Sequence, residues 1–394
     1  MSQRLISRNA PLKRLRDEGY EVSVEGGYLV VRHIPYVTQG RTLSYGVMVS
    51  ALEVSGDTVR EPSDHTVRFA GEVPCTGDGS PFNQIINGYV QETVSQDLVA
   101  EYSFSSKPAS GRYEDYYEKM TTYIRILEGE AHTIDPTATA RTHPVISPEE
   151  ELGSVFRYMD TASSRAGITA ITDKLAGHRI GIVGLGGTGS YILDLVAKTP
   201  VAEIHLYDRD QLLQHNAFRM PGALSVEELA GSPGKVVHLA ASYSKLRSGV
   251  VAHECHISDE NVGELAKLDF VFLSLTGGEA KRGIVTVLEE NHVPFIDCGM
   301  GIYEVDGVLA GQLRTTTSTP GFREHVHGLG RIPFSDGEAD EYSQNIQIAD
   351  LNALNASIAV IRWKKFCGFY LDLEGDHHSV YVIDGNHMLN EDKA

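Results

Sequence analysis

Cysteine, tryptophan and positive charge are all scarce in this chain. Four cysteines and one tryptophan occur in 394 residues. The cysteines are too few and too scattered for a disulfide framework, and no two of them form a CxxC pair. A four-cysteine zinc site therefore has no support, and we expect no structural zinc.

Long hydrophobic runs are also missing. No stretch of about 18 apolar residues is present that could cross a bilayer. The first 20 residues alternate charged and apolar types and lack the apolar core of a secretory signal. We therefore expect a cytoplasmic protein that does not associate with membranes.

Basic residues are outnumbered by acidic ones. The chain has 34 Lys and Arg against 53 Asp and Glu, and its formal net charge is −19. Nucleic-acid backbones and anionic lipid surfaces would repel such a chain, so we expect no nucleic-acid partner. A small nucleotide stays possible, because a few local cations are enough to bind it.

The remaining composition is that of a globular protein, with 41% hydrophobic and 22% charged residues. At roughly 150 residues per domain, the length suggests two or three domains. We predict a smaller α+β domain over residues 1–147 and a larger domain over residues 148–394. The segment 131–150 contains three prolines and is interpreted as the linker between them.

Local patterns in the first domain favour both strands and helices. Gly26 and Gly27 separate two β-like runs and predict a hairpin. Further strands are expected at residues 45–54 and 65–73, and helices at 11–19 and 113–130. The function of this domain stays open, because tyrosines at helical spacing are usually core residues. The polar residues that attract attention here are His65, Tyr113, Tyr116 and Tyr117.

In the second domain, strand-like runs alternate with helical stretches. The strand-like runs cover residues 179–183, 203–208, 269–273 and 293–297. Helices are predicted at residues 188–198 and 232–246, and a third helix carries Leu351, Leu354, Ile358 and Ile361 on one face. Strands that alternate with helices imply right-handed βαβ crossovers. We therefore predict an α/β, Rossmann-like domain with a mostly parallel sheet.

A glycine-rich loop follows the first strand of this domain and opens a helix. Its glycines are Gly184, Gly186, Gly187 and Gly189. Such glycines allow a tight turn and let backbone amides approach a phosphate at the positive end of the helix dipole. Asp208 ends the next strand, where a carboxylate is expected to bind ribose hydroxyls.

The residues after Asp208 separate the possible nucleotides. Asp210, Asn216, Arg219 and Lys235 follow it in order. A nicotinamide-dependent oxidoreductase shares the glycine loop, but it has no need for an amide and a cation just beyond the second strand. A triphosphate site does need cations and donors beside the phosphates. The pattern thus favours ATP, with the oxidoreductase as an alternative.

In order and spacing, these residues resemble the superfamily of ubiquitin-activating enzymes and ThiF/MoeB adenylyltransferases, over roughly residues 150–375. The resemblance implies ATP and Mg²⁺ as cofactors. It assigns ribose binding to Asp208 and phosphate binding to Asn216, Arg219 and Lys235.

The same resemblance implies a homodimer. In this superfamily an arginine before the first strand reaches the γ-phosphate bound by the partner subunit. Arg165 is the candidate for that role, and Arg157 is the alternative. Both assignments come from the resemblance alone.

Two features of the chain depart from the superfamily pattern at possible metal sites. Thr276 stands where an aspartate that holds Mg²⁺ is expected, and a hydroxyl is a weaker ligand than a carboxylate. Asp210 is then a candidate for the missing carboxylate. His325 and His327 are a weaker candidate for another metal, because alternate residues share one face if this segment is a strand.

A third departure concerns the thioester that some members form. The corresponding stretch, residues 314–344, contains no cysteine. Cys75, in a glycine-containing loop, and Cys367 are the remaining candidates; Cys298 follows a strand and is expected to be packed, and burial is also the commoner state expected for Cys367. A reactive thiol needs exposure and a lowered pKa, which the sequence does not show.

The whole chain also resembles a bacterial subgroup encoded beside ubiquitin-like and conjugating-enzyme-like proteins. This resemblance implies ATP-dependent adenylation of the C-terminal carboxylate of a ubiquitin-like protein. The carboxylate is ionised at neutral pH, so no general base is required. The alternatives are a non-catalytic nucleotide-binding scaffold of the same family and a nicotinamide-dependent oxidoreductase.

Overall fold

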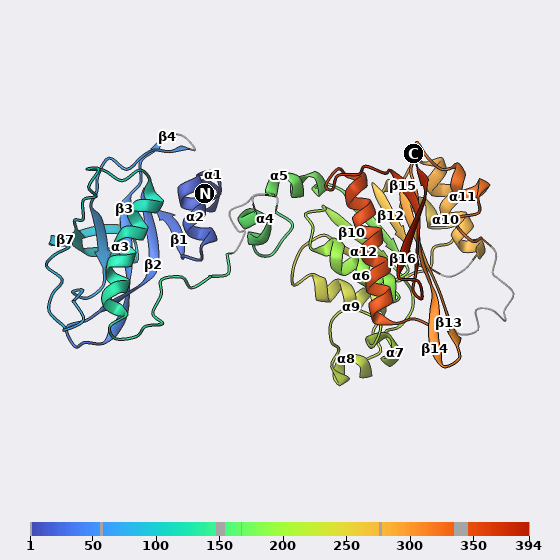
Figure 1. Cartoon of the computed structure of the whole chain (residues 1–394), viewed down its shortest axis with the longest axis horizontal. Coiled ribbons are helices and arrows are strands. Elements are labelled where there is room, and N and C mark those ends of the chain that lie inside the picture. The colour runs from blue at the N-terminus through green and yellow to red at the C-terminus, as the bar shows by residue number, and fades with distance from the viewer. Residues whose placement is uncertain are drawn as a thin grey trace. The chain divides into compact units, whose positions relative to one another are not determined.

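The chain folds into two compact units (Figure 1). The computed structural model describes residues 2–55, 58–146, 154–166, 168–275, 278–334 and 346–393. The first unit comprises Met1–Ser154 with Tyr158–Arg165, and the second comprises Val155–Arg157 with Ala166–Ala394. Each unit has its own hydrophobic core.

The first unit is built on a six-stranded antiparallel sheet with the order β1-β2-β3-β6-β8-β7. Its strands are β1 (Val22–Glu25), β2 (Tyr28–Val37), β3 (Leu43–Ala51), β6 (Val67–Ala70), β7 (Ile86–Ser95) and β8 (Leu98–Phe104). A separate two-stranded pair is formed by β4 (Val54–Ser55) and β5 (Thr58–Val59). The helices are α1 (Ser2–Arg8), α2 (Ala10–Asp17), α3 (Tyr116–Ala131) and α4 (Thr161–Ala166).

Helix α3 covers one face of this sheet and supplies much of the core (Figure 1). It begins at Asp115, whose side chain accepts a hydrogen bond from Glu118 N at 2.8 Å and so satisfies one of the free amides of the first turn. The tyrosines noted in the sequence are core residues, because Tyr113, Tyr116 and Tyr117 are 2%, 1% and 9% exposed.

The sheet of the first unit is curled, so that side chains connect its two ends. Tyr28 Oη donates to Glu92 Oε1 at 2.7 Å, and Ser95 Oγ donates to Glu25 Oε2 at 3.1 Å. These bonds join the β1–β2 hairpin to β7, the strand at the other end of the order. A small second hydrophobic core is formed by buried residues of β2, β3, β7 and β8.

The second unit is built on an eight-stranded mixed sheet with the order β11-β10-β9-β12-β13-β14-β15-β16. The pairs from β11 to β13 are parallel, and the pairs from β13 to β16 are antiparallel. Its strands are β9 (Arg179–Val183), β10 (Glu203–Tyr207), β11 (Val250–His253), β12 (Phe270–Leu273), β13 (Phe295–Val305), β14 (Val308–Ser318), β15 (Asp376–Val382) and β16 (His387–Lys393). This is the predicted Rossmann-like α/β fold.

Helices cover both faces of this sheet (Figure 1). Buried residues of α6 (Gly187–Ala197), α9 (Lys235–Tyr243) and α12 (Ala349–Phe366) share one core, and those of α10 (Gly278–Glu290) belong to another. Within β12, Phe272 faces the first core and Leu273 the second. The shorter helices are α5 (Thr169–Thr172), η1 (Asp173–Leu175), α7 (Gln214–Ala217), α8 (Val226–Ala230), η2 (Val262–Lys267) and α11 (Glu324–Gly328).

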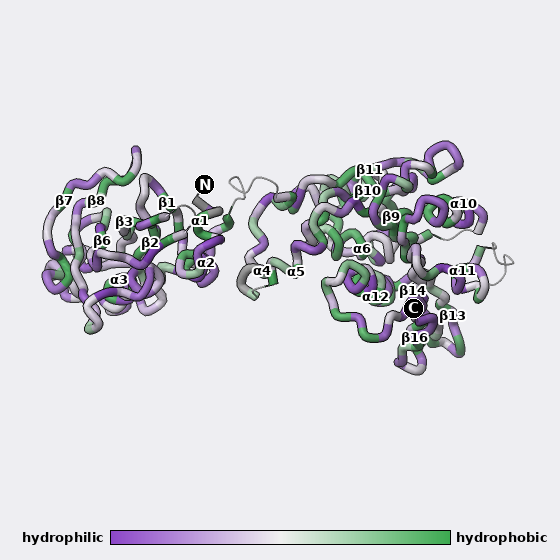
Figure 2. Tube along the Cα trace, turned by 90° about the horizontal axis from the view of Figure 1, so that it is seen from above, coloured by the Kyte–Doolittle hydropathy of each residue, from purple (hydrophilic) through white to green (hydrophobic). Residues whose placement is uncertain are grey.

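The sequence predicted the central strands but missed those at the edge. The run at residues 179–183 coincides with β9, and the helix expected at 188–198 is α6. The antiparallel strands β15 and β16 were not foreseen, because they are rich in polar residues and most of β16 is exposed. Figure 2 shows the hydrophilic colour around β16 beside the more hydrophobic colour around α6.

Candidate functional site

The loop between β9 and α6 has a conformation that depends on glycine. Gly184 has a φ of +88°, and a Cβ there would lie 2.3 Å from Ser274 O. A Cβ at Gly189 would lie 1.9 Å from Gly184 O. Both glycines are therefore required by the close approach of neighbouring backbone.

The other two glycines differ from each other. A Cβ at Gly187 would lie 2.1 Å from Asn352 Nδ2, so packing against α12 requires glycine there too. A Cβ added at Gly186 would have no described atom within 4 Å. Packing within the protein therefore does not explain why position 186 is glycine, and the space beside it is open.

The first turn of α6 has the features that suit an anion. Gly186 is the N-cap, no side chain of the described residues caps the helix, and no acidic residue occurs in its first turn. The amides of a first helical turn have no partner within the helix, and the helix dipole adds positive potential there. Because Gly187, Thr188 and Gly189 are buried, a bound phosphate would satisfy these amides.

Asp208 joins the glycine loop to the loop after β10. Its Oδ2 accepts a hydrogen bond from Leu185 N at 2.7 Å, and its Oδ1 accepts one from Asp210 N at 2.8 Å. A carboxylate oxygen can accept a second bond, so both oxygens stay able to receive ribose hydroxyls. The predicted ribose role fits this position.

Lys235 is the first residue of α9 and lies between two carboxylates. Its Nζ is 2.7 Å from Asp210 Oδ2 and 3.8 Å from Asp208 Oδ2, and the residue is only 6% exposed. The hydrogen bond from Lys235 holds the pKa of Asp210 below its ordinary value. Asp210 therefore keeps the ammonium group in place at the edge of the site.

Asn216 shapes the turn that carries Arg219. Asn216 is 4% exposed, and its Oδ1 accepts a hydrogen bond from Leu213 N at 2.8 Å. Its backbone carbonyl accepts one from Arg219 N at 3.0 Å. The structure thus gives Asn216 a role in shaping the chain, and its side-chain NH₂ is still available to a phosphate.

Arg219 is a cation with an unsatisfied donor. Its Nε is buried, and among the residues that the structure describes none accepts a hydrogen bond from it. Burial lowers the pKa of Arg219, and the charge of Asp210 partly opposes that change. A buried donor without a partner is costly, and an anion in the site would remove that cost.

The candidate site residues described above meet where the parallel strands end, at the carboxyl-terminal edge of the sheet. They come from the carboxyl ends of β9 and β10, from α7 and from the start of α9. In open parallel sheets this edge is where ligands bind. The tertiary structure thus assembles the predicted set, which can bind ribose and several phosphates of a nucleotide.

For three predicted residues the described part of the structure does not establish a place in the site. Arg165 lies on α4, but its side chain is outside the described part of the structure. Thr276 lies outside the described residues altogether. Arg157 is exposed, and its Nε donates to Ser244 O at 3.4 Å. The roles proposed for these residues stay predictions.

Asp297 is a buried carboxylate that sequence reasoning did not select. It pairs with Leu273 in the register of β12 and β13, and its oxygens lie 2.9 Å from Lys281 Nζ and 2.5 Å from Arg314 Nη2. In this ion triad both carboxylate oxygens have a cationic partner, although Oδ1 accepts no well-aligned hydrogen bond from the described residues. The signal for it was an acidic residue directly after an apolar strand run.

Asp210 offers Mg²⁺ a carboxylate at the edge of the sheet where β9 and β10 end. Over the described residues, no three His, Cys, Asp or Glu side chains gather as a metal site. Mg²⁺ in nucleotide sites is commonly held by one or two carboxylates together with phosphates. Asp210, whose side chain is 60% exposed, fits such a site, and its assignment as a ligand stays a prediction.

The histidine pair His325 and His327 does not form the suggested metal site. The segment is the short helix α11, not a strand, so the premise that the two residues share a face was wrong. His325 Nε2 contacts Thr317 O at 2.9 Å, whereas His327 Nε2 contacts Glu289 Oε2 at 2.8 Å. The two side chains thus bind different partners.

The cysteines are placed as buried or partly buried thiols. Cys75 is 1% exposed, and its Sγ donates to Val73 O at 3.4 Å. Burial raises the pKa of Cys75, and it raises the pKa values of Cys298 and Cys367 to about 12. A thioester at Cys75 would therefore require local opening of the loop.

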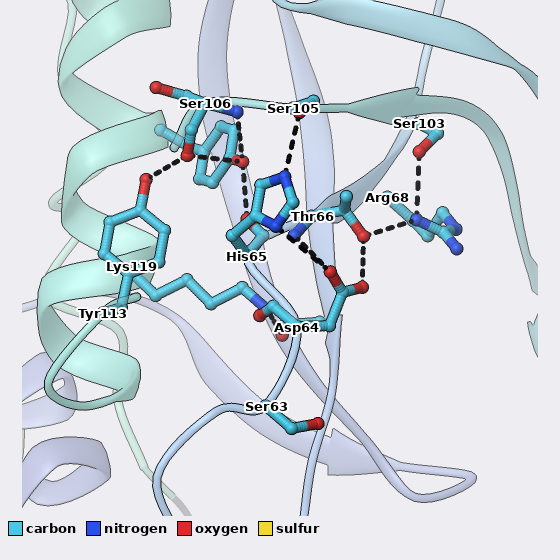
Figure 3. A network of polar contacts seen from close by, with 12 residues as sticks. Ser63, Asp64, His65, Thr66, Arg68, Ser103, Ser105, Ser106, Tyr113 and Lys119 are labelled. Atoms are coloured by element: carbon cyan, nitrogen blue, oxygen red, sulfur yellow. Dashed lines mark hydrogen bonds and ion pairs between the residues drawn. The ribbon is translucent and has the colours of Figure 1, made fainter. Parts of the chain in front are cut away.

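The first unit contains a second polar cluster, around Lys119 (Figure 3). Lys119 is 2% exposed and donates from Nζ to Ser50 Oγ at 2.9 Å and to Asp64 O at 2.6 Å. Burial lowers its pKa to about 8. His65 Nε2 lies 3.1 Å from Ser105 Oγ. The bonds of Lys119 fasten α3 to β3 and to the loop before β6, whereas the His65–Ser105 contact joins two loops.

Comparison with known proteins matches both parts of the chain to families. Residues 161–330 match the ThiF family, and residues 10–161 match DUF6791, a domain of unknown function. No curated protein matches the chain in sequence. Within the described residues, no helix combines the length and the apolar character needed to span a bilayer.

Solved structures resemble part of the chain. E. coli MccB in complex with ATP has 17% sequence identity and a TM-score of 0.46, and the match covers 59% of this chain and 70% of MccB. E. coli MccB with MccA-N7isoASN has 18% identity and a TM-score of 0.46, with coverages of 59% and 70%. PaaA has 16% identity and a TM-score of 0.44, with coverages of 57% and 75%.

The ThiF match spans the whole candidate site. It includes the glycine loop, Asp208, Arg219 and Lys235, and it agrees with the family resemblance of the motifs. Residues 161–330, which contain this site, are thus similar to the ThiF family.

Proposed function

We propose that the protein is an ATP-dependent adenylyltransferase that activates the C-terminal carboxylate of a ubiquitin-like protein. The observation that carries this proposal is the partly buried Arg219, whose buried Nε has no hydrogen-bond partner among the described residues, at the same sheet edge as the first turn of α6. Lys235 adds a second, buried cation there. Two cations and a row of free amides suit a polyphosphate better than the single pyrophosphate of a dinucleotide.

In the proposed reaction a carboxylate oxygen attacks the α-phosphorus of ATP. A new O–P bond forms, the bond to the bridging oxygen breaks, and pyrophosphate leaves with the electron pair. The acid is ionised at neutral pH, so the protein supplies positioning and charge stabilisation instead of a base. Arg219 and Lys235 stabilise the charge that develops on the phosphate oxygens.

The remaining residues position the nucleotide. Asp208 accepts hydrogen bonds from the ribose, and Asn216 holds the turn that carries Arg219. Asp210 holds Lys235 and offers a carboxylate to Mg²⁺, which would neutralise phosphate charge when bound. We propose that Arg165, or alternatively Arg157, completes the γ-phosphate site of a partner subunit in a homodimer.

The partners follow from the resemblance to the bacterial subgroup. We propose a ubiquitin-like substrate and a conjugating-enzyme-like acceptor, acting in the cytoplasm. The net charge of −19 favours a neutral or basic substrate protein over an acidic one. Cys75 is the proposed thioester residue only if its loop opens, since its thiol is buried.

ATP–pyrophosphate exchange tests this proposal. The purified chain is assayed alone and with each small protein encoded beside it that ends in glycine. Exchange that depends on one such protein supports the proposal and identifies the substrate, and intact mass then shows whether Cys75 carries a thioester. ATP binding without exchange would favour the scaffold alternative, and preferential NAD binding would favour the oxidoreductase.

A further inference from the structure

Asn352 is a buried polar residue near the nucleotide site that none of the motifs includes. It lies in the first turn of α12 and is 1% exposed. Its Oδ1 accepts a hydrogen bond from Thr188 Oγ1 at 2.8 Å, and its Nδ2 donates a longer one to Arg219 O at 3.5 Å. One side chain therefore contacts both the start of α6 and Arg219, whose buried Nε has no partner among the described residues.

The same amide also fills the space that a side chain at Gly187 would need. An ideal Cβ at Gly187 would lie 2.1 Å from Asn352 Nδ2 and 2.4 Å from its Cγ. Glycine at position 187 lets the first turn of α6 approach α12 closely enough for this contact. Asn352 thus sets where the first turn of α6 lies, and it does so from a helix about 160 residues later in the chain.

We infer that Asn352 is a positioning residue for the nucleotide. It holds the first turn of α6 at a fixed distance from the backbone of Arg219, so that the helix amides and the guanidinium can contact the same chain of phosphates. Asn352 itself is not expected to touch the ligand. This inference rests on the proposed function, because it presumes that a nucleotide binds between these two elements.

The chain offers a matched control on the same helix. Asn355 is also 1% exposed, and it makes equivalent bonds to the sheet instead of the glycine loop. Its Oδ1 accepts from Thr315 Oγ1 at 3.1 Å, and its Nδ2 donates to Gly299 O at 3.0 Å. Loss of either asparagine removes one buried and one partly buried hydrogen bond between α12 and the rest of the second unit, but only Asn352 contacts the glycine loop.

The experiment compares Asn352→Ala with Asn355→Ala in the full chain. Calorimetric titration with ATP gives the Kd, exchange kinetics give kcat and KM, and thermal unfolding gives Tm. We expect both variants to lower Tm. Asn352→Ala should raise the Kd and the KM for ATP about tenfold or more, because small displacements of positioning groups are costly. Asn355→Ala should keep the wild-type ATP affinity.

A second variant keeps the inference testable if Asn352→Ala does not fold. Thr188→Val removes the hydroxyl that Asn352 binds and changes the volume little. It should raise the Kd for ATP in the same direction, and the double variant should lose less affinity than the sum of the single losses. Additive losses, or equal ATP affinities for Asn352→Ala and Asn355→Ala, would overturn the inference.

The outcomes also separate this inference from the proposed function. If the wild-type chain binds ATP but no protein substrate gives exchange, adenylation fails while the Kd comparison still decides the role of Asn352. If exchange occurs and the two asparagine variants behave alike, the positioning role fails alone. A wild-type chain that binds no ATP overturns both.

Discussion

At the scale of single residues, Arg219 illustrates a binding-site residue that lowers the stability of the ligand-free protein. Its buried Nε has no partner among the described residues, and burial lowers the pKa of its guanidinium. Such a group costs free energy in the ligand-free protein and is compensated only when an anion binds. Removing it should therefore cost activity without costing stability.

We predict that Arg219→Ala lowers the ATP–pyrophosphate exchange rate about 10²–10³-fold, as the loss of one charge-stabilising donor commonly does. Thermal unfolding should show a Tm equal to or above that of the wild type. Arg179→Ala is the control, because Arg179 begins β9 at the opposite edge of the sheet and pairs with Asp269 at 3.3 Å. An unchanged exchange rate for Arg219→Ala would remove this residue from the mechanism.

Arg247 is a buried cation of a different kind. It is 0% exposed, and its guanidinium donates to the backbone carbonyls of Thr199, Val201, Ala202 and Ser248. Burial lowers its pKa to about 10. The carbonyls of Thr199, Val201 and Ala202 lie between α6 and β10, whereas Ser248 follows Arg247 in the segment before β11, so the residue fastens these two loops to each other.

Arg247→Met should lower the free energy of unfolding by more than about 3 kcal/mol, because each buried carbonyl left without a donor costs about 1–3 kcal/mol. Urea denaturation followed by the fluorescence of Trp363 measures this loss, since Trp363 lies in the core of the same unit. Lys245→Met, two residues away and exposed, is the control. Equal unfolding free energies for the two variants would contradict the structural role.

At the scale of elements, the glycine loop and α6 combine two kinds of requirement. Gly184, Gly187 and Gly189 are fixed by contacts with other parts of the chain. Gly186 faces open space and has no such contact. The sequence motif treats all four alike, whereas the structure separates the glycines that fold the loop from the glycine beside the ligand space.

Substitutions by alanine should separate these two kinds. Gly189→Ala should destabilise the second unit strongly, because the new methyl would lie 1.9 Å from Gly184 O. Gly186→Ala should fold with nearly the wild-type Tm and bind ATP at least about tenfold more weakly, because the methyl enters the space that the phosphate needs. Calorimetry with ATP and thermal unfolding test both. Wild-type ATP affinity in Gly186→Ala would place the phosphate elsewhere.

At the scale of the whole molecule, the chain forms two units, each with its own hydrophobic core. The only tryptophan is in the core of the second unit, and the first unit is rich in tyrosine. Tryptophan fluorescence therefore reports on the unfolding of the second unit. The first unit also carries a buried lysine whose pKa is about 8, which makes its stability depend on pH.

The direction of this dependence follows from Lys119. Its folded pKa of about 8 is below the unfolded value of 10.5, so between these values the unfolded state binds more protons. Below pH 8 both states are protonated, and the cost of burying the charge is fully present. The first unit should therefore become more stable, by roughly 1–2 kcal/mol, as the pH rises from 8 to 9.5.

Near-UV circular dichroism of the tyrosines during urea unfolding at pH 8 and 9.5 measures this change. Above pH 10 the opposite trend should begin, because burial raises the pKa of Tyr113, Tyr116 and Tyr123 and the unfolded state then releases protons first. Lys119→Met is the control and should abolish the rise. A stability that falls between pH 8 and 9.5 would contradict the prediction.

The sequence alone determined the features that depend on local patterns. The apolar run before Gly184, the glycines themselves and the acidic end of the next strand predicted β9, α6 and the position of Asp208, because strand and helix periodicities are read within a few residues. The family resemblance of these motifs is confirmed by the ThiF match over residues 161–330. The division at residues 147 and 148 and the site roles stay predictions.

Only the tertiary structure decided the features that depend on contacts between distant segments. The burial of Cys75, the unpaired donor of Arg219 and the ion triad of Asp297 follow from which groups fold against each other. Asn352 is the clearest case, because its partner Thr188 is 164 residues away and nothing in its own surroundings marks it. Polar edge strands such as β16 likewise become strands through pairing with a neighbour, since their own residues have little hydrophobic pattern.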